Sequence, residues 1–311
     1  MLRDIAKGKE DVAAVIAILA EVAPDVIALQ GIDYDLENRA VLALIAALAE
    51  AGLDLPHFVA LRPNTGLPTG LDLNKNGRLG DGADAQGYGR FAGQSGMALL
   101  SAYPLELVAD HSAQLWAELP WASFPSEYFG RKEAEALRLS HTGHWEVDVL
   151  TPSGRVRVLT WSAGAPVFDG PEDRDGLRNR DELRFWERRL AEVDGPFVLM
   201  GKSNLDPLDG DGLTEAMADL LSNPGLQDPR PKSAGGALAP GTGHKGDPAL
   251  DTVDWPEDGP GNLRVSYVLP WAGAVVTGAG VFWPAPGTSD LLGEEGDAAG
   301  PHRLVWVDID F

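Results

Sequence analysis

The sequence contains no cysteine, and this absence excludes three kinds of chemistry. Without thiols the chain has no disulfide bond, no thiolate-bound metal and no cysteine nucleophile. Basic residues are also scarce, because 25 lysines and arginines stand against 47 aspartates and glutamates, which gives a formal net charge of −22. Such a chain has no basic stretch with which to displace counterions from a phosphate backbone, so we expect no nucleic-acid partner.

Long hydrophobic runs are missing as well. The first residues, MLRDIAKGKEDV, carry charges where a signal peptide would have its apolar core, so we expect no signal peptide. The longest apolar stretch is interrupted by Glu21, Pro24 and Asp25 before it could span a bilayer. The sequence therefore predicts an acidic, water-soluble protein without a membrane partner, and it leaves the cellular location open.

What the sequence does contain is typical of a globular domain. Of the 311 residues 44% are hydrophobic and 23% are charged, and the 37 glycines and 23 prolines stay below the share that marks low-complexity chains. No internal repeat is visible. We therefore expect one monomeric domain over residues 1–311, with a hydrophobic core and long, turn-rich loops.

Helices and strands are both predicted by the apolar pattern. Apolar residues recur at helical spacing within residues 12–22, 39–51 and 181–193, with Asp11 as the expected N-cap of the first helix and Pro24 as its stop. Short apolar runs between turns predict strands at residues 25–30, 57–61, 96–101, 144–151, 155–161, 197–201, 263–270 and 302–309. The alternation of the two predicts an α/β sandwich.

One loop carries an unexpected charge. In VLMGKSNLDPLDGDG, residues 198–212, a buried strand breaks into an acidic turn, and Lys202 places an ammonium beside Asn204 where an oxygen ligand for a metal would be expected. Three interpretations are open. Lys202 is an exposed lysine paired with Asp206 or Asp209, or a cation that replaces a metal, or a desolvated amine that forms a Schiff base with a carbonyl substrate.

Several segments together resemble the endonuclease/exonuclease/phosphatase superfamily, and in particular its bacterial, often exported branch. They follow one another from about Leu2 to the C-terminus: PDVIALQGIDYD, GQSGMALLSAYPL, PVFDGPEDRDGLRNRDELRFW, FVLMGKSNLDPLDGDG, DPALDTVDW, GPGNLRVSYVLP, GVFWPAP and HRLVWVDI. The resemblance implies a four-layered α/β sandwich, in which two mixed β-sheets pack face to face with helices outside. It also implies that the N-terminal strand of the family is absent before Leu2.

The same resemblance implies hydrolysis of phosphoesters with a divalent metal, usually Mg²⁺, held by carboxylates and an asparagine while histidines handle protons. Most of these positions carry another residue here. Gly31 stands where the family has a metal-binding glutamate, and Ser162 and Arg180 stand where it has histidines. Lys202 and Ser266 stand where it has aspartates. We therefore expect that Mg²⁺ does not bind.

Asn204 and His302 are what remains of the family's catalytic set. We interpret the chain as a phosphoesterase-fold protein that has lost metal-dependent chemistry, either a natural pseudoenzyme or an engineered scaffold or binding protein, with room for a small molecule in the former pocket. Random drift is the plainer explanation. The alternative is an enzyme, either a Schiff-base catalyst that uses Lys202 or a residual metal-dependent phosphodiesterase or phosphatase that recruits Asp33, Asp35 or Asp206.

A separate segment, DLNKNGRLGDGAD at residues 72–84, has the spacing of a calcium loop, with oxygen side chains at alternate positions and a glycine at the sixth. Its twelfth position is alanine rather than glutamate, so another carboxylate must close the site. The alternative is an Asn-Gly turn without metal. We expect structural Ca²⁺ with these ligands: Asp72, Asn74, Asn76, the carbonyl of Arg78, and Asp81 or Asp84.

His141 and His144 have the H-x-x-H spacing of some metal sites. On a strand, residues three apart point to opposite faces, so we expect no shared metal here. His144 is predicted to be structural.

Overall fold

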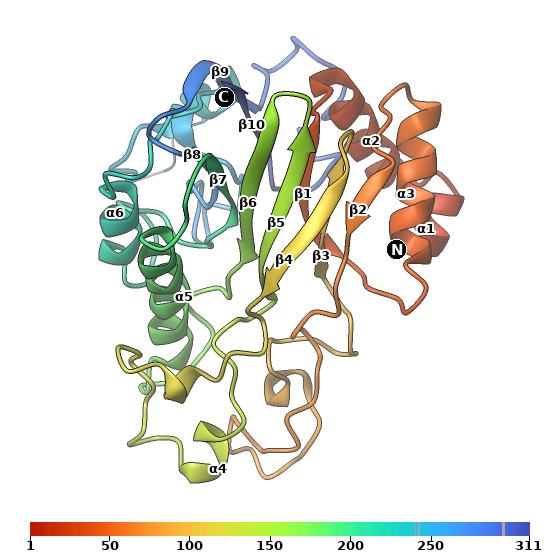
Figure 1. Cartoon of the computed structure of the whole chain (residues 1–311). Coiled ribbons are helices and arrows are strands. Elements are labelled where there is room, and N and C mark those ends of the chain that lie inside the picture. Colours follow the sequence, from red (N-terminus) through yellow and green to blue (C-terminus); the bar gives the residue numbers. More distant parts are fainter. Residues whose placement is uncertain (240, 242, 294–295) are drawn as a thin grey trace.

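Five strands form a mixed β-sheet, in the order β4-β5-β6-β7-β8 (Figure 1). Strands β6 and β7 are parallel, and the other neighbours are antiparallel. The computed structural model describes residues 1–239, 241, 243–293 and 296–311. The strands of this sheet are β4 (Leu105–Asp110), β5 (Gly143–Thr151), β6 (Gly154–Ser162), β7 (Phe197–Lys202) and β8 (Ser266–Pro270).

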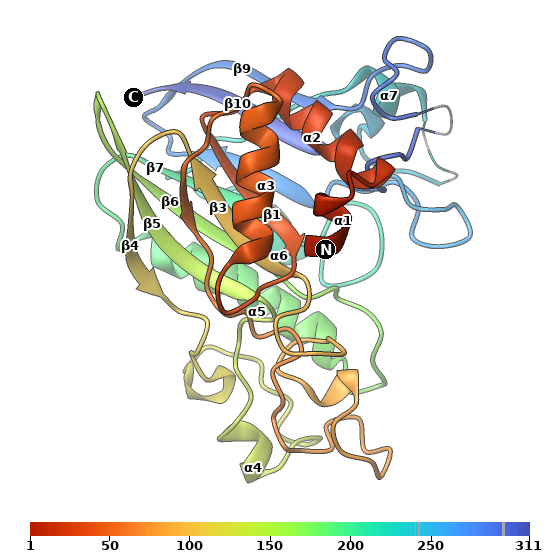
Figure 2. The same cartoon turned by 90° about the vertical axis from the view of Figure 1, so that its right-hand side faces the viewer.

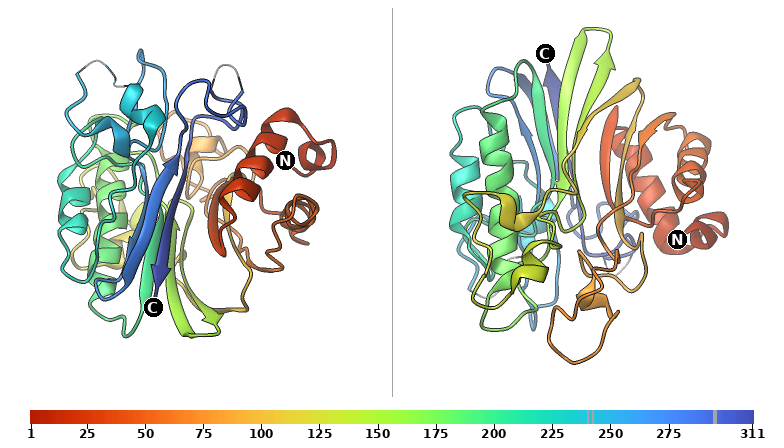
Figure 3. Two further views of the ribbon diagram at one scale, coloured as in Figure 1. Left: turned by 90° about the horizontal axis from the view of Figure 1, so that it is seen from above. Right: turned by 60° about the horizontal axis from the view of Figure 1, so that its bottom comes forward.

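A second β layer faces this sheet and consists of two antiparallel sheets, with the orders β1-β3-β2 and β10-β9. Figure 3 shows β9 and β10 between the N-terminal helices and the five-stranded sheet. The strands are β1 (Val26–Ile32), β2 (His57–Val59), β3 (Gly96–Ser101), β9 (Val275–Phe282) and β10 (Leu304–Asp310).

Helices cover the outer face of each β layer, as Figures 1 and 2 show, with α1 to α3 on one side and α5 and α6 on the other. None of the helices in the described ranges is long and apolar enough to cross a membrane. The α-helices are α1 (Leu2–Ala6), α2 (Glu10–Val22), α3 (Arg39–Glu50), α4 (Arg131–Ala134), α5 (Arg174–Leu190), α6 (Glu215–Leu221) and α7 (Ala234–Leu238). Three short 3-10 helices are η1 (Gly82–Asp84), η2 (Trp116–Glu118) and η3 (Pro248–Leu250).

Apolar side chains fill the three spaces between the four layers. Neighbouring residues of a strand point to opposite faces, and on β3 this places Leu100 against α2 and α3 and Leu99 between the two β layers. Trp161 and Trp186 pack on each other between the five-stranded sheet and α5. The four-layered α/β sandwich is thus confirmed. It differs from the expected pair of mixed sheets, because only the five-stranded sheet is mixed.

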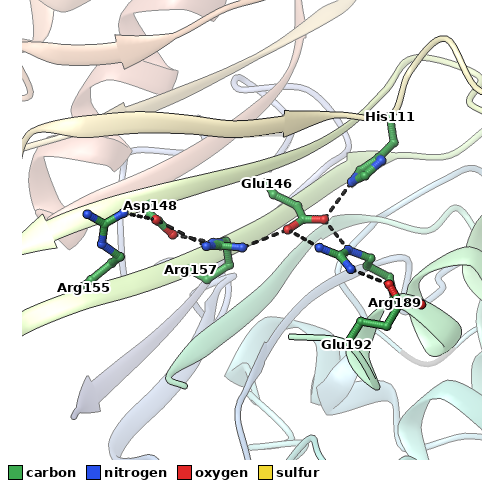
Figure 4. Close-up of polar contacts among 7 residues, drawn as sticks. All are labelled: His111, Glu146, Asp148, Arg155, Arg157, Arg189 and Glu192. Atoms are coloured by element: carbon green, nitrogen blue, oxygen red, sulfur yellow. Dashed lines mark hydrogen bonds and ion pairs between the residues drawn. The ribbon is translucent and has the colours of Figure 1, made fainter. Parts of the chain in front are cut away.

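A buried polar network fixes α5 to the sheet (Figure 4). The fully buried carboxylate of Glu146 on β5 accepts hydrogen bonds from Arg189 of α5 at 2.6 Å and from Arg157 of β6 at 3.0 Å. His111 Nε2 lies 2.7 Å from the same carboxylate. Arg157 also pairs with Asp148. Two buried acids are therefore compensated by arginines from two elements, as buried charges require.

The apolar pattern predicts most of these elements, although their ends differ. Helix α2 begins at Glu10 with Lys9 as its N-cap, so the expected cap at Asp11 is wrong. Helix α5 begins at Arg174, earlier than predicted, and β8 begins only at Ser266. Strands β4 and β9, helices α1, α4, α6 and α7, and the three 3-10 helices were not predicted.

Candidate functional site

Three of the substituted positions lie side by side at one end of the five-stranded sheet. Lys202 is the last residue of β7, and the strand pairing places it opposite Ser162 of β6 and Ser266 of β8. The family resemblance implied a shared site for these positions, and the strand register brings them together. The centre of this sheet end therefore carries an ammonium between two hydroxyl groups.

Lys202 is not the exposed, ion-paired loop lysine of the first interpretation. Its side chain is half-buried at the wall of a groove, and burial lowers its pKa. Among the described residues no carboxylate lies within ion-pair distance of its Nζ. Asp206 instead accepts a hydrogen bond from the backbone N–H of Arg264 at 2.7 Å, and Asp209 accepts one from the N–H of Lys245 at 2.8 Å. The two acids of the turn hold loops, and Lys202 has no counter-ion there.

A groove of about 1180 Å³ opens in front of Lys202. Gly31, Ser266 and His302 also line it, so four of the predicted site residues share one cavity. Gly31 lies at an irregularity in the pairing of β1, with φ +81°, and a Cβ placed on it would meet no atom within 4 Å. Its left-handed backbone favours glycine over any residue with a side chain. The backbone conformation at position 31 therefore suits glycine rather than the glutamate that the family has there.

His302 lines the same groove and is near enough to Lys202 to feel its charge, two residues before β10 begins. Part of its ring is exposed to the groove, while the ring edge packs against Trp255 with centroids 5.5 Å apart. Burial of the rest of the ring, together with the positive charges of Lys202 and Arg303, lowers the pKa of His302 to about 4. The imidazole is therefore neutral at physiological pH and can donate or accept a hydrogen bond.

The other predicted positions are not among the residues that line the groove. Ser162 is buried. Asn204 has a left-handed backbone, with φ +54°, and its Nδ2 donates to the carbonyl of Ala163 at 2.8 Å. Arg180 lies on α5, with its Nε 3.7 Å from Oδ1 of Asp181. The structure thus separates these three from the cavity that Lys202 and His302 share.

The aspartates that a residual metal enzyme would recruit already have other roles. Asp35 accepts hydrogen bonds from the backbone N–H groups of Arg39 and Ala40 at 2.9 Å, and so fixes the start of α3. Asp33 accepts one from the N–H of Ser95 at 3.1 Å and pairs with the N-terminal amino group. These acids stabilise the backbone around the site.

The residues at this sheet end do not fit the Mg²⁺ of the family. Mg²⁺ requires oxygen ligands in octahedral geometry, usually with carboxylates among them. Lys202 and the two serines supply an ammonium and two neutral hydroxyls, and Gly31 supplies no side chain. Across the described part of the chain, no group of three His, Asp or Glu side chains is arranged to hold a metal.

Gln30 and His141 were not predicted to share the surroundings of Lys202. Gln30 lines the groove, and its buried Nε2 has no hydrogen-bond partner within the described part of the chain. Burial, and to a smaller extent nearby positive charges, lower the pKa of His141 to about 3. Lys202 is one of these charges, so the two side chains are close together. The predicted structural role of His144 agrees with its buried ring, which stacks on Trp186. Gln30 stands directly before Gly31 in the sequence, and this position is the signal that could have identified it as a residue of the site.

The predicted calcium loop forms a closed turn around its acidic residues. The carboxylate of Asp72 accepts hydrogen bonds from the N–H groups of Asn76 at 3.0 Å and Gly77 at 2.8 Å. The amides of Asn74 and Asn76 donate to Oδ2 of Asp81 at 3.4 and 2.6 Å. Four of the expected ligands are therefore close together.

The remaining two expected ligands of this loop have separate contacts. Asp84 is buried, and its carboxylate accepts hydrogen bonds from the backbone N–H groups of Leu73 at 2.9 Å and Gly80 at 2.8 Å. These bonds fix the conformation of the turn. The backbone N–H of Arg78 donates to Oδ1 of Asn76 at 2.8 Å. Of the two carboxylates considered for closing the site, Asp81 is the one in contact with the other ligands.

Solved structures with the same fold are distant in sequence. An endonuclease/exonuclease/phosphatase family protein from Leptotrichia buccalis C-1013-b aligns with a TM-score of 0.55 at 15% identity, covering 97% of this chain and 93% of that one. The 3'-5' exonuclease NExo from Neisseria meningitidis gives 0.51 at 15% identity, with 97% and 95% coverage. A humanised D. rerio TDP2 gives 0.52 at 11% identity, with 99% and 93% coverage. These likenesses show the shared fold.

No curated protein sequence matches the chain. The sequence pattern described as Endonuclease/Exonuclease/phosphatase family, however, matches residues 3–290, which is nearly the whole chain. The protein therefore belongs to the endonuclease/exonuclease/phosphatase family.

Proposed function

We propose that this protein is a binding protein on a phosphoesterase fold, without Mg²⁺-dependent hydrolysis of phosphoesters, and that its groove holds a small anionic molecule against Lys202. The observation that supports this is the half-buried ammonium of Lys202, which has no carboxylate partner among the described residues. A desolvated charge is stabilised by an opposite charge, so an anion is the complementary ligand. A natural pseudoenzyme and an engineered scaffold would both have this site.

The same ammonium opposes the family's metal. At a separation of ~4 Å and an effective dielectric constant of about 20, a single positive charge repels a divalent cation by roughly 8 kcal/mol. Lys202 stands where the family resemblance places a metal-binding aspartate, so this repulsion acts where the metal would bind. Asn204, the ligand that the resemblance leaves, donates its amide Nδ2 to the backbone carbonyl of Ala163.

We therefore expect no turnover of bis-nitrophenyl phosphate above background with either Mg²⁺ or Mn²⁺. The measurement is nitrophenolate release at several metal concentrations, with a commercial phosphodiesterase as positive control for the assay. The matched variant is Lys202→Met, which removes the positive charge but restores no ligand and so should be equally inactive. Metal-dependent turnover by the unmodified protein would contradict the proposal and favour a residual phosphodiesterase.

A second candidate function is an amine catalyst. It is favoured by one observation, which is that burial lowers the pKa of Lys202 and no acid among the residues that the structure describes pairs with it. An uncharged lysine can attack a carbonyl carbon, and loss of water then gives a Schiff base. Reduction of such a mixture with borohydride, followed by mass spectrometry, would locate the adduct. An adduct confined to Lys202, together with turnover of the carbonyl compound, would favour this function over the binding protein.

We also propose that the loop at residues 72–84 binds Ca²⁺. Asp72, Asn74, Asn76 and Asp81 already lie in direct contact, so the ion would replace hydrogen bonds within a preformed turn. A ligand that binds only the folded state raises the melting temperature, so millimolar Ca²⁺ should raise it and a chelator should reverse the change. The control is Asp81→Asn, which should weaken the effect. If Ca²⁺ produced neither calorimetric heat nor a shift of the melting temperature, the loop would be a turn that binds no metal.

A further inference from the structure

His244 lies between two buried aspartates, one of which belongs to the turn after β7 (residues 206–212). Its Nε2 is 2.9 Å from Oδ2 of Asp251, and its Nδ1 is 3.4 Å, an ion-pair distance, from Oδ2 of Asp209. The side chains of His244 and Asp209 are each 7% exposed, and that of Asp251 is 1% exposed. Both ring nitrogens face a carboxylate, so neither is left to act on a substrate.

This geometry favours the protonated, positively charged form of His244. A neutral imidazole carries one N–H, so the lone pair of its other nitrogen would face a carboxylate, whereas an imidazolium carries an N–H on both nitrogens. Burial opposes the charge, but the negative charges of Asp251 and Asp209 outweigh it and raise the pKa of His244. Burial also raises the pKa of Asp251 to about 7. The pair therefore titrates as a unit and keeps a shared proton at neutral pH.

The other charged groups around the cluster are one further acid and several side chains with contacts of their own. Asp206, in the same turn as Asp209, adds a buried negative charge, and its carboxylate accepts a hydrogen bond from the N–H of Asp209 at 2.9 Å. The remaining charged side chains of the neighbouring segments are Arg264, which pairs with Asp228, Lys232, which pairs with Asp247, Lys245, which donates to the carbonyl of Leu208, and Glu257, which lies beside Gly241. Loss of the shared proton would therefore leave the carboxylates of Asp209 and Asp251 on either side of a neutral ring.

The segment that carries Asp251 also borders the candidate functional site. Thr252 follows Asp251, and its Oγ1 accepts a hydrogen bond from the backbone N–H of Ser266 at 3.0 Å. The next residue, Val253, forms a β-bridge with His302. A displacement of Asp251 would therefore change the backbone contacts of two residues of the site.

We propose that His244, Asp209 and Asp251 form a proton-operated latch, which holds residues 244–254 against the turn after β7 and releases them when the cluster loses its proton. The segment and the turn meet at Asp209, whose carboxylate also accepts hydrogen bonds from the N–H groups of Lys245 and Gly246 at 2.8 Å. Buried carboxylates without a cation between them repel each other and favour exposure to water, so the segment would move away from the turn. This inference does not depend on the ligand proposed for Lys202.

The latch should be closed at low pH and open at high pH. Because the pKa of His244 is raised in the closed form, the closed cluster binds its proton more tightly than the open segment, in which the pKa is 6.5. The contribution of His244 to the closed form is therefore fully present below 6.5 and is lost as the pH rises through the raised pKa. One proton changes the opening equilibrium by about tenfold per pH unit in this window.

Hydrogen exchange on the full chain, followed from about pH 6 to about pH 9 with a chelator present and corrected for intrinsic exchange rates, tests the latch. Amide protection in residues 244–254 should fall about tenfold per pH unit above 6.5 and then level off, whereas protection of β5 should stay constant. His244→Gln should remove this dependence and leave the segment weakly protected throughout. Asp209→Asn should move the loss of protection to lower pH. His57→Gln, the same change at a histidine of β2, is the control and should keep the original profile.

The titration of the His244 ring nitrogens by NMR gives the second readout, because it uses the unmodified protein and stands even if a variant fails to fold. The ring should titrate above 6.5 in the unmodified protein and at lower pH in Asp209→Asn. A ring that titrates at or below 6.5, protection of residues 244–254 that does not change with pH, or an unchanged profile in His244→Gln would each overturn the proposal. An equal loss of protection in β5 would overturn it as well, because the whole fold rather than this segment would then respond to pH.

Discussion

Replacing Glu146 by glutamine should lower the free energy of unfolding by about 3–5 kcal/mol, the cost typical of breaking a buried ion pair by removing one partner. Glu146 is fully buried and accepts hydrogen bonds from Arg157 and Arg189 (Figure 4). Glutamine keeps the shape but removes the charge that compensates both arginines. Urea denaturation of the unmodified protein and of Glu146→Gln at neutral pH measures the difference.

The matched control for this variant is Glu192→Gln. Glu192 also pairs with Arg189, at 2.6 Å, but its side chain is 70% exposed. An exposed ion pair contributes about 0–1 kcal/mol, so this variant should be close to the unmodified protein. Equal effects of the two substitutions would show that Glu146 does not fix α5 in the way described.

The pH dependence of stability follows from the same group. Burial alone would raise the pKa of Glu146, but hydrogen bonds from His111 and Arg189 and their positive charges lower it to about 2. Because the folded-state pKa is depressed, the contribution of Glu146 to stability is fully present above its unfolded value of 4.5 and is lost as the pH falls toward 2. The difference between unmodified protein and Glu146→Gln should therefore shrink over that range.

Replacing Lys202 by methionine should have the opposite effect and raise the free energy of unfolding. The ammonium is half-buried without a counter-ion among the described residues, and burying an uncompensated polar group costs roughly 1–3 kcal/mol in proteins. Methionine has a similar length and carries no charge. Urea denaturation at neutral pH, in a buffer free of phosphate and sulfate, should show a gain of this size for Lys202→Met.

The gain should also depend on pH. Since the folded-state pKa of Lys202 lies below the value of 10.5 in the unfolded chain, the unmodified protein recovers stability as the pH rises toward 10.5. The advantage of Lys202→Met should therefore be largest near neutrality and should shrink in alkaline buffer. Lys132→Met, at an exposed position, should show neither effect. A destabilised Lys202→Met would mean that the ammonium has a stabilising partner.

The layered fold could be predicted because several of its strands are short apolar runs, a pattern that is typical of strands buried between two layers. Every residue of β3 is buried, and the run GMALLS contains the apolar residues that a strand between two apolar layers needs. Strand β4 could not be found in the same way, because it lies at the sheet edge and most of its residues are exposed. Its sequence LELVAD therefore lacks a clear period.

The site could be predicted only in part. The resemblance placed Lys202, Ser162 and Ser266 in one site, and the strand register confirms that they are neighbours. The environment of Lys202 depends on which groups are brought to it from distant segments, such as His302 in the loop before β10. No local pattern at residues 198–212 encodes that arrangement, so the sequence left an exposed lysine and a buried one equally open.

Binding of inorganic phosphate, measured by calorimetry with and without Mg²⁺, tests the central claim most directly. That claim is that a cation of the protein itself, Lys202, stands where the family resemblance places a metal ligand and binds anions without metal. The account predicts that phosphate binds equally well with Mg²⁺ and with a chelator present, and that Lys202→Met abolishes this binding. Phosphate binding that requires Mg²⁺, or that persists in Lys202→Met, would contradict it.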